Sequence, residues 1–203
     1  MSTFIDKKSY RSGFTLIEIL IAISLTSIIL TAVYSSFFLI HKAIGSVDEM
    51  MLKMQETRTV LDTLRREISS AIYDPENTRT CFRIVDRDFK GKPINEITFT
   101  AFSRLNPGIT EFTYYVEEKD SRLVLFKKVN LESSREDKQA TDILEDINGF
   151  SIEAKYDDKW VRTWDSDIHK SIPKELRVNL SMIVRGETIT FSEILRPYIG
   201  SVL

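Results

Sequence analysis

The sequence predicts an α+β protein in which a long N-terminal helical spine, transmembrane in its first half, packs against a mostly antiparallel β-domain. Three observations lead to this fold class. Residues 14–40 are almost entirely apolar, residues 41–73 repeat apolar side chains at helical spacing, and many segments after Pro75 alternate apolar and polar side chains as strands do. With 203 residues, the chain is long enough to bury a core beyond the apolar run.

The apolar run extends from Phe14 to Ile40, about 27 residues, and exceeds the roughly 20 residues that a helix needs to cross a bilayer core. No small-residue cleavage site of the secretory type follows it. The cations Lys7, Lys8 and Arg11 precede the run. The positive-inside rule therefore predicts a cytoplasmic N-terminus, with the bulk of the chain on the other side of the membrane.

Glu18 is the only charged residue inside the run. An unpaired carboxylate in lipid costs on the order of several kcal/mol, so this residue needs a compensating partner. The alternatives are a plain signal anchor and a buried helix of a soluble domain. Neither of them explains a carboxylate at this position.

The spine continues beyond the membrane as an amphipathic helix. Apolar residues recur every seven positions, with a second series three positions later; these are Val47, Met54, Leu61 and Ile68, and then Met50, Leu64 and Ala71, with Thr57 as an exception. The opposite side is charged, with Lys53, Glu56, Arg58, Asp62 and Arg66. The apolar stripe is expected to pack against the domain's own sheet.

Two local signals indicate a weak point in this helix and its expected end. Gly45-Ser46 is a weak point between its lipid and aqueous halves. Pro75 disfavours helix at the residue before it, so the helix is expected to end at Tyr73.

The segments that follow are rich in β-forming residues. Residues 96–102 form one expected strand, residues 110–118 and 122–129 form a hairpin around 119–121, residues 150–164 form two strands around Asp157-Asp158, and residues 175–195 form a hairpin around Arg185-Gly186. Residues 132–140 are polar and expected to be a loop. The segment Thr141–Ile147 is ambiguous, and one interpretation is a helical turn.

Composition excludes several functions. The formal net charge is −2 and no cluster of Lys and Arg is visible, so nucleic-acid binding is not expected. Cys81 is the single cysteine, which rules out an intramolecular disulfide; a half-buried strand thiol is the expected setting.

An enzyme is not expected either, because no nucleophile elbow, phosphate-binding loop or zinc-protease motif occurs. His169 lies near Asp165 and Asp167, but a solvated acidic loop explains this cluster better than a metal site. Trp160 and Trp164 are four residues apart and would share a face of one strand, where packing is favoured over a carbohydrate platform.

The stretch from Gly13 to Glu18, "GFTLIE" behind a short basic tail, resembles the type IV prepilin signature. The resemblance implies that a membrane prepilin peptidase cuts between Gly13 and Phe14 and methylates the new amino terminus of Phe14. It also implies that Glu18 pairs, in the assembled filament, with the Phe14 amine of a neighbouring subunit. Such an ion pair offsets the free-energy cost of desolvating both groups. It also sets the register of assembly, because only a correctly inserted neighbour can form it.

Three further stretches resemble minor pseudopilin J of type II secretion systems: residues 59–72, 143–160 and 171–182. The resemblance implies a non-enzymatic component at the pseudopilus tip that helps initiate filament assembly for protein export across the outer membrane. It implies other minor pseudopilins (I and K type), the major pseudopilin and the prepilin peptidase as partners, without any cofactor or metal. The alternative is a minor pilin of a type IV pilus or of a DNA-uptake pseudopilus, with an adhesin or binding role.

This interpretation divides the chain into a leader peptide (1–13), a transmembrane helix (14–40), the periplasmic half of the spine (41–73) and a β-rich globular domain (74–203). The protein is expected in the inner membrane as a single-pass chain with a cytoplasmic N-terminus and a periplasmic C-terminal domain.

Overall fold

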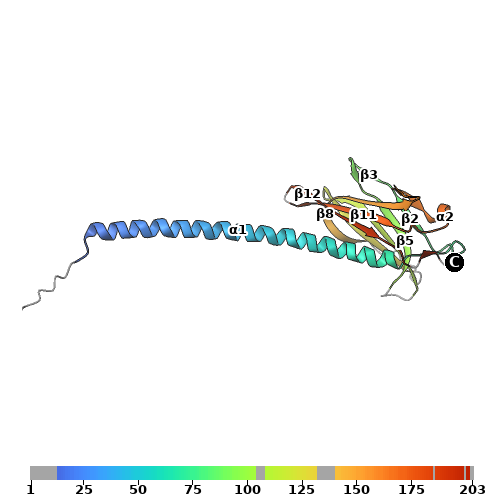
Figure 1. Cartoon of the computed structure of the whole chain (residues 1–203), viewed down its shortest axis with the longest axis horizontal. Helices are drawn as coiled ribbons and strands as arrows, with labels where there is room; N and C mark the ends of the chain where they lie inside the picture. The colour runs from blue at the N-terminus through green and yellow to red at the C-terminus, as the bar shows by residue number, and fades with distance from the viewer. Residues whose placement is uncertain (1–12, 104–107, 132–139, 185, 199, 202–203) are drawn as a thin grey trace, which may run out of the picture. The chain divides into compact units, whose positions relative to one another are not determined.

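The computed structural model describes residues 13–103, 108–131, 140–184, 186–198 and 200–201 (Figure 1). The chain divides into two compact units, residues 1–49 and residues 50–203. The first unit holds the apolar half of a helix. The second holds the rest of that helix and the whole β-domain.

Helix α1 covers Leu16–Ser69, a single helix of 54 residues. The predicted end at Tyr73 is therefore wrong, because tertiary partners take over the last carbonyl groups. The Ser69 carbonyl accepts a hydrogen bond from the Tyr198 amide (3.1 Å), and the Ser70 carbonyl accepts one from the Phe102 amide (3.3 Å). These hydrogen bonds replace the helical pattern several residues before Asp74, the residue at which Pro75 would disfavour a helix.

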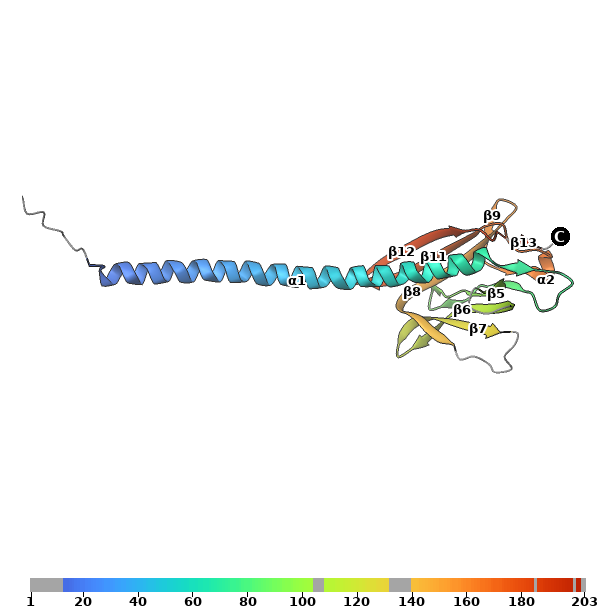
Figure 2. The ribbon, with the colours of Figure 1, turned by 90° about the horizontal axis from the view of Figure 1, so that it is seen from below.

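The second unit buries one face of α1 against the sheet, as predicted (Figure 2). The buried residues of this face are Thr57, Val60, Leu61, Leu64 and Ile68. Thr57, the exception in the apolar series, fits because its hydroxyl donates to the Lys53 carbonyl (2.9 Å) and lies 3.6 Å from the Met182 sulfur. The side chain of Val47 lies outside the described residues.

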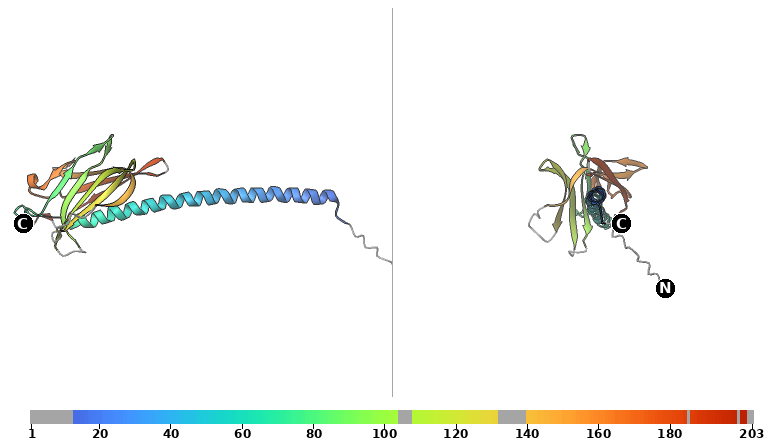
Figure 3. Two further views of the ribbon diagram at one scale, coloured as in Figure 1. Left: turned by 180° about the vertical axis from the view of Figure 1, so that it is seen from behind. Right: turned by 90° about the vertical axis from the view of Figure 1, so that its left-hand side faces the viewer.

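The main sheet has nine strands, and every neighbouring pair in it is antiparallel. In spatial order, its path is β10 (Trp164–Asp165), β2 (Phe82–Val85), β5 (Glu96–Phe102), β6 (Ile109–Lys119), β7 (Arg122–Leu131), β8 (Thr141–Tyr156), β11 (Leu176–Val184) and β12 (Glu187–Leu195), with β9 (Lys159–Val161) paired to β8. Figure 3 shows this sheet from two further sides.

Small elements complete the second unit. β1 (Ile72–Tyr73) pairs in parallel with β13 (Gly200–Ser201), and β3 (Asp88–Phe89) pairs with β4 (Lys92–Pro93). The short helix α2 covers Ser166–His169 and is capped by the Asp165 side chain.

Most of the strand predictions are confirmed. The strand at Glu96–Phe102 has the predicted bounds. The predicted hairpins close with the pairs Lys119↔Arg122, Tyr156↔Lys159 and Val184↔Glu187. Asp157 and Asp158 both adopt positive φ in their turn. The polar segment 132–139, predicted as a loop, lies outside the described residues.

The interpretation of Thr141–Ile147 as a helical turn is wrong, because this segment is the first part of β8. It pairs with β7, for example Leu125↔Leu144, and the pairing contains register shifts. Leu144 and Ile147 thereby reach the core, so tertiary pairing overrides an ambiguous local pattern.

The core lies between the sheet and α1 and includes a cluster of aromatic rings. Phe99 contacts Phe82, Phe112 and Tyr114, with ring centroids 6.0, 5.7 and 6.4 Å away. All four side chains are buried.

Candidate functional site at the start of the apolar helix

The start of α1 is built as a reciprocal cap between Thr15 and Glu18. The Thr15 amide and hydroxyl each donate to Oε2 of Glu18 at 2.9 Å, while the Glu18 amide donates to the Thr15 hydroxyl at 3.3 Å. This is a capping box, in which the side chains satisfy amide groups that have no partner inside the helix. The carboxylate also lies at the positive end of the helix dipole.

Sequence reasoning missed Thr15, although the signal was present. A Ser or Thr followed three residues later by an acidic residue, directly before an apolar run, is a helix-start pattern. The pattern "TLIE" fits it at residues 15–18. Thr15 thus provides a partner for Glu18 within the same chain.

Gly13 and Phe14 lie directly before this cap and are exposed, Phe14 to 84%. A Cβ placed on Gly13 would meet no atom of the described residues within 4 Å, so packing against them does not require a glycine there. The structure brings the three predicted site residues, Gly13, Phe14 and Glu18, together at one end of the helix.

The described part of the chain contains one helix long and apolar enough to cross a membrane, and it occupies Leu16–Lys42 with a mean hydropathy of 2.4. No residue of its most apolar window is buried within the chain. A fully exposed apolar surface of this length requires lipid or protein around it.

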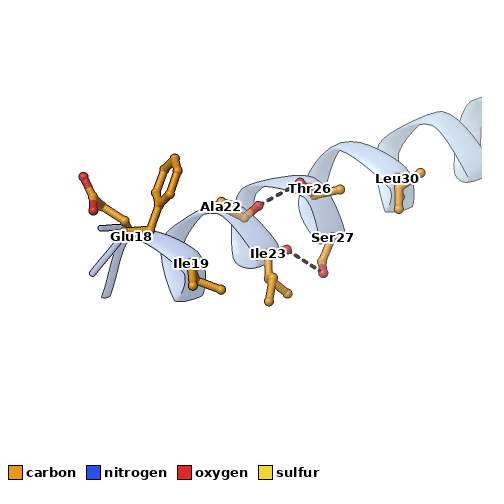
Figure 4. Close-up of a pocket in the computed structure, with 8 residues that line it drawn as sticks. Glu18, Ile19, Ala22, Ile23, Thr26, Ser27 and Leu30 are labelled. Atoms are coloured by element: carbon orange, nitrogen blue, oxygen red, sulfur yellow. Dashed lines mark hydrogen bonds between the residues drawn. The ribbon is translucent and has the colours of Figure 1, made fainter. Parts of the chain in front are cut away.

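Five hydroxyl side chains within this helix are satisfied internally. Each donates to the carbonyl group four residues earlier, at 2.7–3.0 Å; the donors are Ser24, Thr26, Ser27, Thr31 and Ser36. Figure 4 shows two of these bonds, along the apolar surface that continues from Glu18 to Leu30. No unpaired hydroxyl from this set would face lipid, which removes a cost of membrane insertion.

The other candidate catalytic or metal-binding residues pack against, or form ion pairs with, side chains of the β-domain. The His169 ring stacks on Trp164, with centroids 4.1 Å apart, and Asp165 binds Arg83 at 3.1 Å while capping α2. No group of three or more metal-ligating side chains lies together in the described ranges. The acidic segment is therefore a short capped helix rather than the expected loop.

Trp160 and Trp164 do not share one strand, so the expectation of a common face is wrong. Trp160 lies on β9 beneath the Arg177 guanidinium, 4.6 Å from the ring centroid, whereas Trp164 lies on β10 and is buried. The Trp164 indole donates to the Ser171 carbonyl at 3.1 Å.

Cys81 is half-buried, as predicted, but it precedes β2 rather than lying within it. Its sulfur lies 3.8 Å from Oε2 of Glu111. Burial, and then the neighbouring Glu111 carboxylate, raise the pKa of this thiol to about 12, so it stays protonated and unreactive at neutral pH.

Two protein-family models match the chain, one at its N-terminal part and one over most of the remainder. Residues 8–34 match the prokaryotic N-terminal methylation motif, and residues 40–191 match the family of type II secretion system (T2SS), protein J. Among curated proteins, none matches the chain significantly.

Two solved structures are similar in fold. One is a chain of the GspK-GspI-GspJ complex from the type 2 secretion system of enterotoxigenic Escherichia coli, at 13% identity and a TM-score of 0.48, covering 71% of this chain and 97% of that chain. The other is a type IV-like pilin from Thermus thermophilus, at 11% identity and a TM-score of 0.48, covering 71% of this chain and 94% of that chain.

Proposed function

Because this chain belongs to the protein J family of the type II secretion system, and is a minor pseudopilin of that machinery, we propose that it acts at the tip of the pseudopilus and helps to start filament assembly. The observation that carries the proposal is the start of α1. There an exposed Gly13-Phe14 junction precedes Glu18, the single carboxylate in the apolar first half of the helix.

Processing comes first in this proposal. A prepilin peptidase cuts between Gly13 and Phe14 and methylates the Phe14 amine. The methylation motif at residues 8–34 supports this step, and so does a glycine that no internal contact explains.

Glu18 then acts in assembly. Before a neighbour arrives, Thr15 holds the carboxylate through two hydrogen bonds, which lowers the cost of keeping it in lipid. Cleavage creates a cationic amine on Phe14, and in the filament the Phe14 amine of a neighbouring subunit pairs with Glu18. Only a neighbour at the correct depth satisfies both groups, so the pair sets the register of insertion.

The apolar helix anchors the protein in a membrane. We place residues 1–13 in the cytoplasm as the leader, residues 14–40 across the inner membrane, and the remainder of the chain, from residue 41, in the periplasm. The cations before the apolar run support this orientation. A membrane-anchored component that assembles with other subunits has no need of a catalytic residue, and we assign none.

The partners follow from family membership. We propose other minor pseudopilins of the I and K type, together with the major pseudopilin, as neighbours in the filament. The solved complex of GspK, GspI and GspJ comes from another organism and concerns those proteins.

The test is deletion of the gene with complementation, measuring protein secretion and the number and length of pseudopili. A tip component predicts few filaments and lost secretion without the protein, restored by the wild-type chain. Filaments of normal number that are thinner or weaker would contradict the proposal and indicate a shaft subunit. Normal filaments with lost surface adhesion would instead indicate an adhesin.

A further inference from the structure

One margin of the main sheet is β12, which pairs with β11 on one side only (Figure 2). Among the strands that the structure describes, none pairs with its other side. The pair Val184↔Glu187 closes a two-residue hairpin, and such a closing pair exchanges both backbone hydrogen bonds. The register has no shift along the ladder, so every second residue of β12 directs its N–H and C=O away from β11. These residues are Thr188, Thr190, Ser192 and Ile194.

This edge lacks most of the usual protections against pairing. It is nine residues long and contains no proline and no bulge, and its only charged residues are Glu187 and Glu193. The opposite edge strand, β10, has only two residues. Lysine, proline, bulges or a short strand commonly prevent an exposed edge from pairing with another chain, and β12 has none of these.

A groove lies beside this edge. Its volume is about 370 Å³, and its lining comes from α1 (Arg58, Leu61, Asp62 and Arg65) and from β12 (Phe191, Ser192 and Glu193). Thr57 contacts Met182, the cross-strand partner of Ile189, and Arg65 pairs with Glu193. α1 and β12 therefore run in the same direction, with the groove between them.

The cations of the groove differ in their partners. Arg65 is held by Asp62 at 2.9 Å and by Glu193. Arg58 is exposed, and the structure gives it no ion pair or hydrogen bond to any described residue. A guanidinium presented in this way favours a carboxylate, which it can bind through two parallel hydrogen bonds.

An apolar contact lies two helical turns away. Met51 is seven residues before Arg58, on the same side of α1, and is 64% exposed. A strand added to β12 would direct alternate side chains toward α1, and these side chains would meet the line from Met51 to Arg58.

We propose that β12 is a docking edge for an extended segment of another polypeptide, which pairs with β12 as a further strand. This segment directs a carboxylate to Arg58 and an apolar side chain toward Met51. Backbone hydrogen bonds to the free edge supply the pairing, and the groove selects the side chains. The proposal rests on residues 50–203 and does not depend on the role of Glu18.

A second copy of this chain does not fit the edge. Antiparallel pairing of two β12 strands would bring Glu193 of the second copy to the α1 side, but Arg65 of its own chain already holds that carboxylate. Parallel pairing about a twofold axis along the strand would invert the faces. The side chains then presented to α1 would be Thr188, Thr190, Ser192 and Ile194, none of which carries a carboxylate.

The test measures binding of short fluorescent probe peptides to the full-length chain in uncharged detergent micelles, by anisotropy. The first probe is Thr-Val-Thr-Glu-Thr-Val-Thr, and two matched probes carry Gln or Lys in place of Glu. The Glu peptide should bind about fivefold more tightly than the Gln peptide, since one partly exposed ion pair contributes an effect of this order. The Lys peptide should bind most weakly.

Two pairs of variants separate the charge from the edge. Arg58→Ala should abolish the preference for Glu over Gln, while Arg66→Ala, which removes another exposed cation of α1, should keep it. Thr190→Pro removes an outward N–H without touching the ladder to β11, and should weaken every probe by about fivefold or more; Thr190→Ala should not. Thermal melting confirms that each variant is folded.

Several results would overturn the proposal. These are equal binding of the Glu and Lys peptides, binding unaffected by Thr190→Pro, and the absence of saturable binding. Self-association of the full-length chain that Thr190→Pro abolishes would also overturn it, because the occupant of the edge would then be a second copy.

Discussion

Glu67 of α1 and Lys127 of β7 form an ion pair that ties the helix to the centre of the sheet, with 18% and 17% of their side chains exposed. The Tyr114 hydroxyl of β6 donates to the same carboxylate. The Lys127 ammonium also lies 4.9 Å from the Phe112 ring centroid, over its face. One helical residue therefore satisfies polar groups from two strands that are otherwise surrounded by core.

Replacement of Glu67 should be costly for this reason. Glu67→Ala leaves Lys127 and Tyr114 without their acceptor in a mostly buried setting, and we expect a loss of about 1–3 kcal/mol in the free energy of unfolding. Urea unfolding of the folded chain measures it. The matched control is Glu56→Ala on the same helix, where the side chain is 46% exposed and pairs, among the described residues, only with Lys53 at 3.6 Å. That change should cost less than about 0.5 kcal/mol, and equal losses would contradict this account of Glu67.

The apolar face of α1 gives a second prediction. The fragment from about Ile44 should fold and remain soluble without the membrane half, since residues 50–203 form a compact unit. Leu61 is 5% exposed, so Leu61→Ala should cost about 2–5 kcal/mol. Leu52 is 59% exposed, and Leu52→Ala should leave the thermal midpoint of the fragment nearly unchanged. An unchanged midpoint for Leu61→Ala would show that this stripe does not form the core of the fragment.

Processing of the N-terminus is a third prediction. Gly13→Val should leave the precursor uncut in the membrane, because the β-branched side chain occupies the position after which the peptidase cuts. No contact with a described residue opposes the change, so the fold of residues 50–203 should be unaffected. Intact-mass measurement of the membrane form distinguishes the cut, methylated chain from the precursor. Ser12→Ala is the control and should be processed normally; a wild-type chain that keeps its leader would refute the assignment.

The carboxylate of Glu18 should be separable from cleavage. Glu18→Ala removes both the Thr15 contacts and the group that pairs with a neighbour's Phe14 amine. We expect normal cleavage after Gly13 but impaired filament initiation, counted as pseudopili per cell. Thr15→Val removes the hydroxyl of the cap and retains the carboxylate, so it should assemble far better than Glu18→Ala. Equal defects would assign the effect to the helix cap instead of the pair between subunits.

Cys81 gives a prediction on pH. Its pKa is about 12 in the folded chain against an ordinary value of 9.0, so the folded state keeps a proton that the unfolded state releases. The contribution of this thiol to stability is complete below pH 9.0 and is lost as the pH rises toward about 12. Unfolding free energies measured at pH 8 and at higher pH should fall less steeply for Cys81→Ala than for the wild-type chain. Alkylation at pH 8 should be slow until urea unfolds the protein, and rapid alkylation of the folded chain would contradict the burial of this thiol.

Local signals in the sequence determined the features that depend on neighbouring residues. The apolar run, the start of the helix near Gly13–Glu18 and the periodic stripe containing Leu61 and Ile68 are all visible in short windows, because helical periodicity and membrane length are local properties. The hairpins around Asp157-Asp158 and Arg185-Gly186 were predictable for the same reason, since turn residues between alternating strands specify their own register. The Thr15–Glu18 cap belongs to this class, because its pattern lies within four residues.

The tertiary structure decided everything that depends on partners distant in the chain. Thr141–Ile147 is a strand because β7 supplies its hydrogen bonds. α1 ends at Ser69, where the Tyr198 amide binds the Ser69 carbonyl and the Phe102 amide binds that of Ser70. The pairings of Arg65 with Glu193 and of Glu67 with Lys127, and the unprotected edge of β12, follow from the order of strands around the helix. A single sequence does not reveal these relations, because the free energy of a pairing depends on residues that only the folded chain brings together.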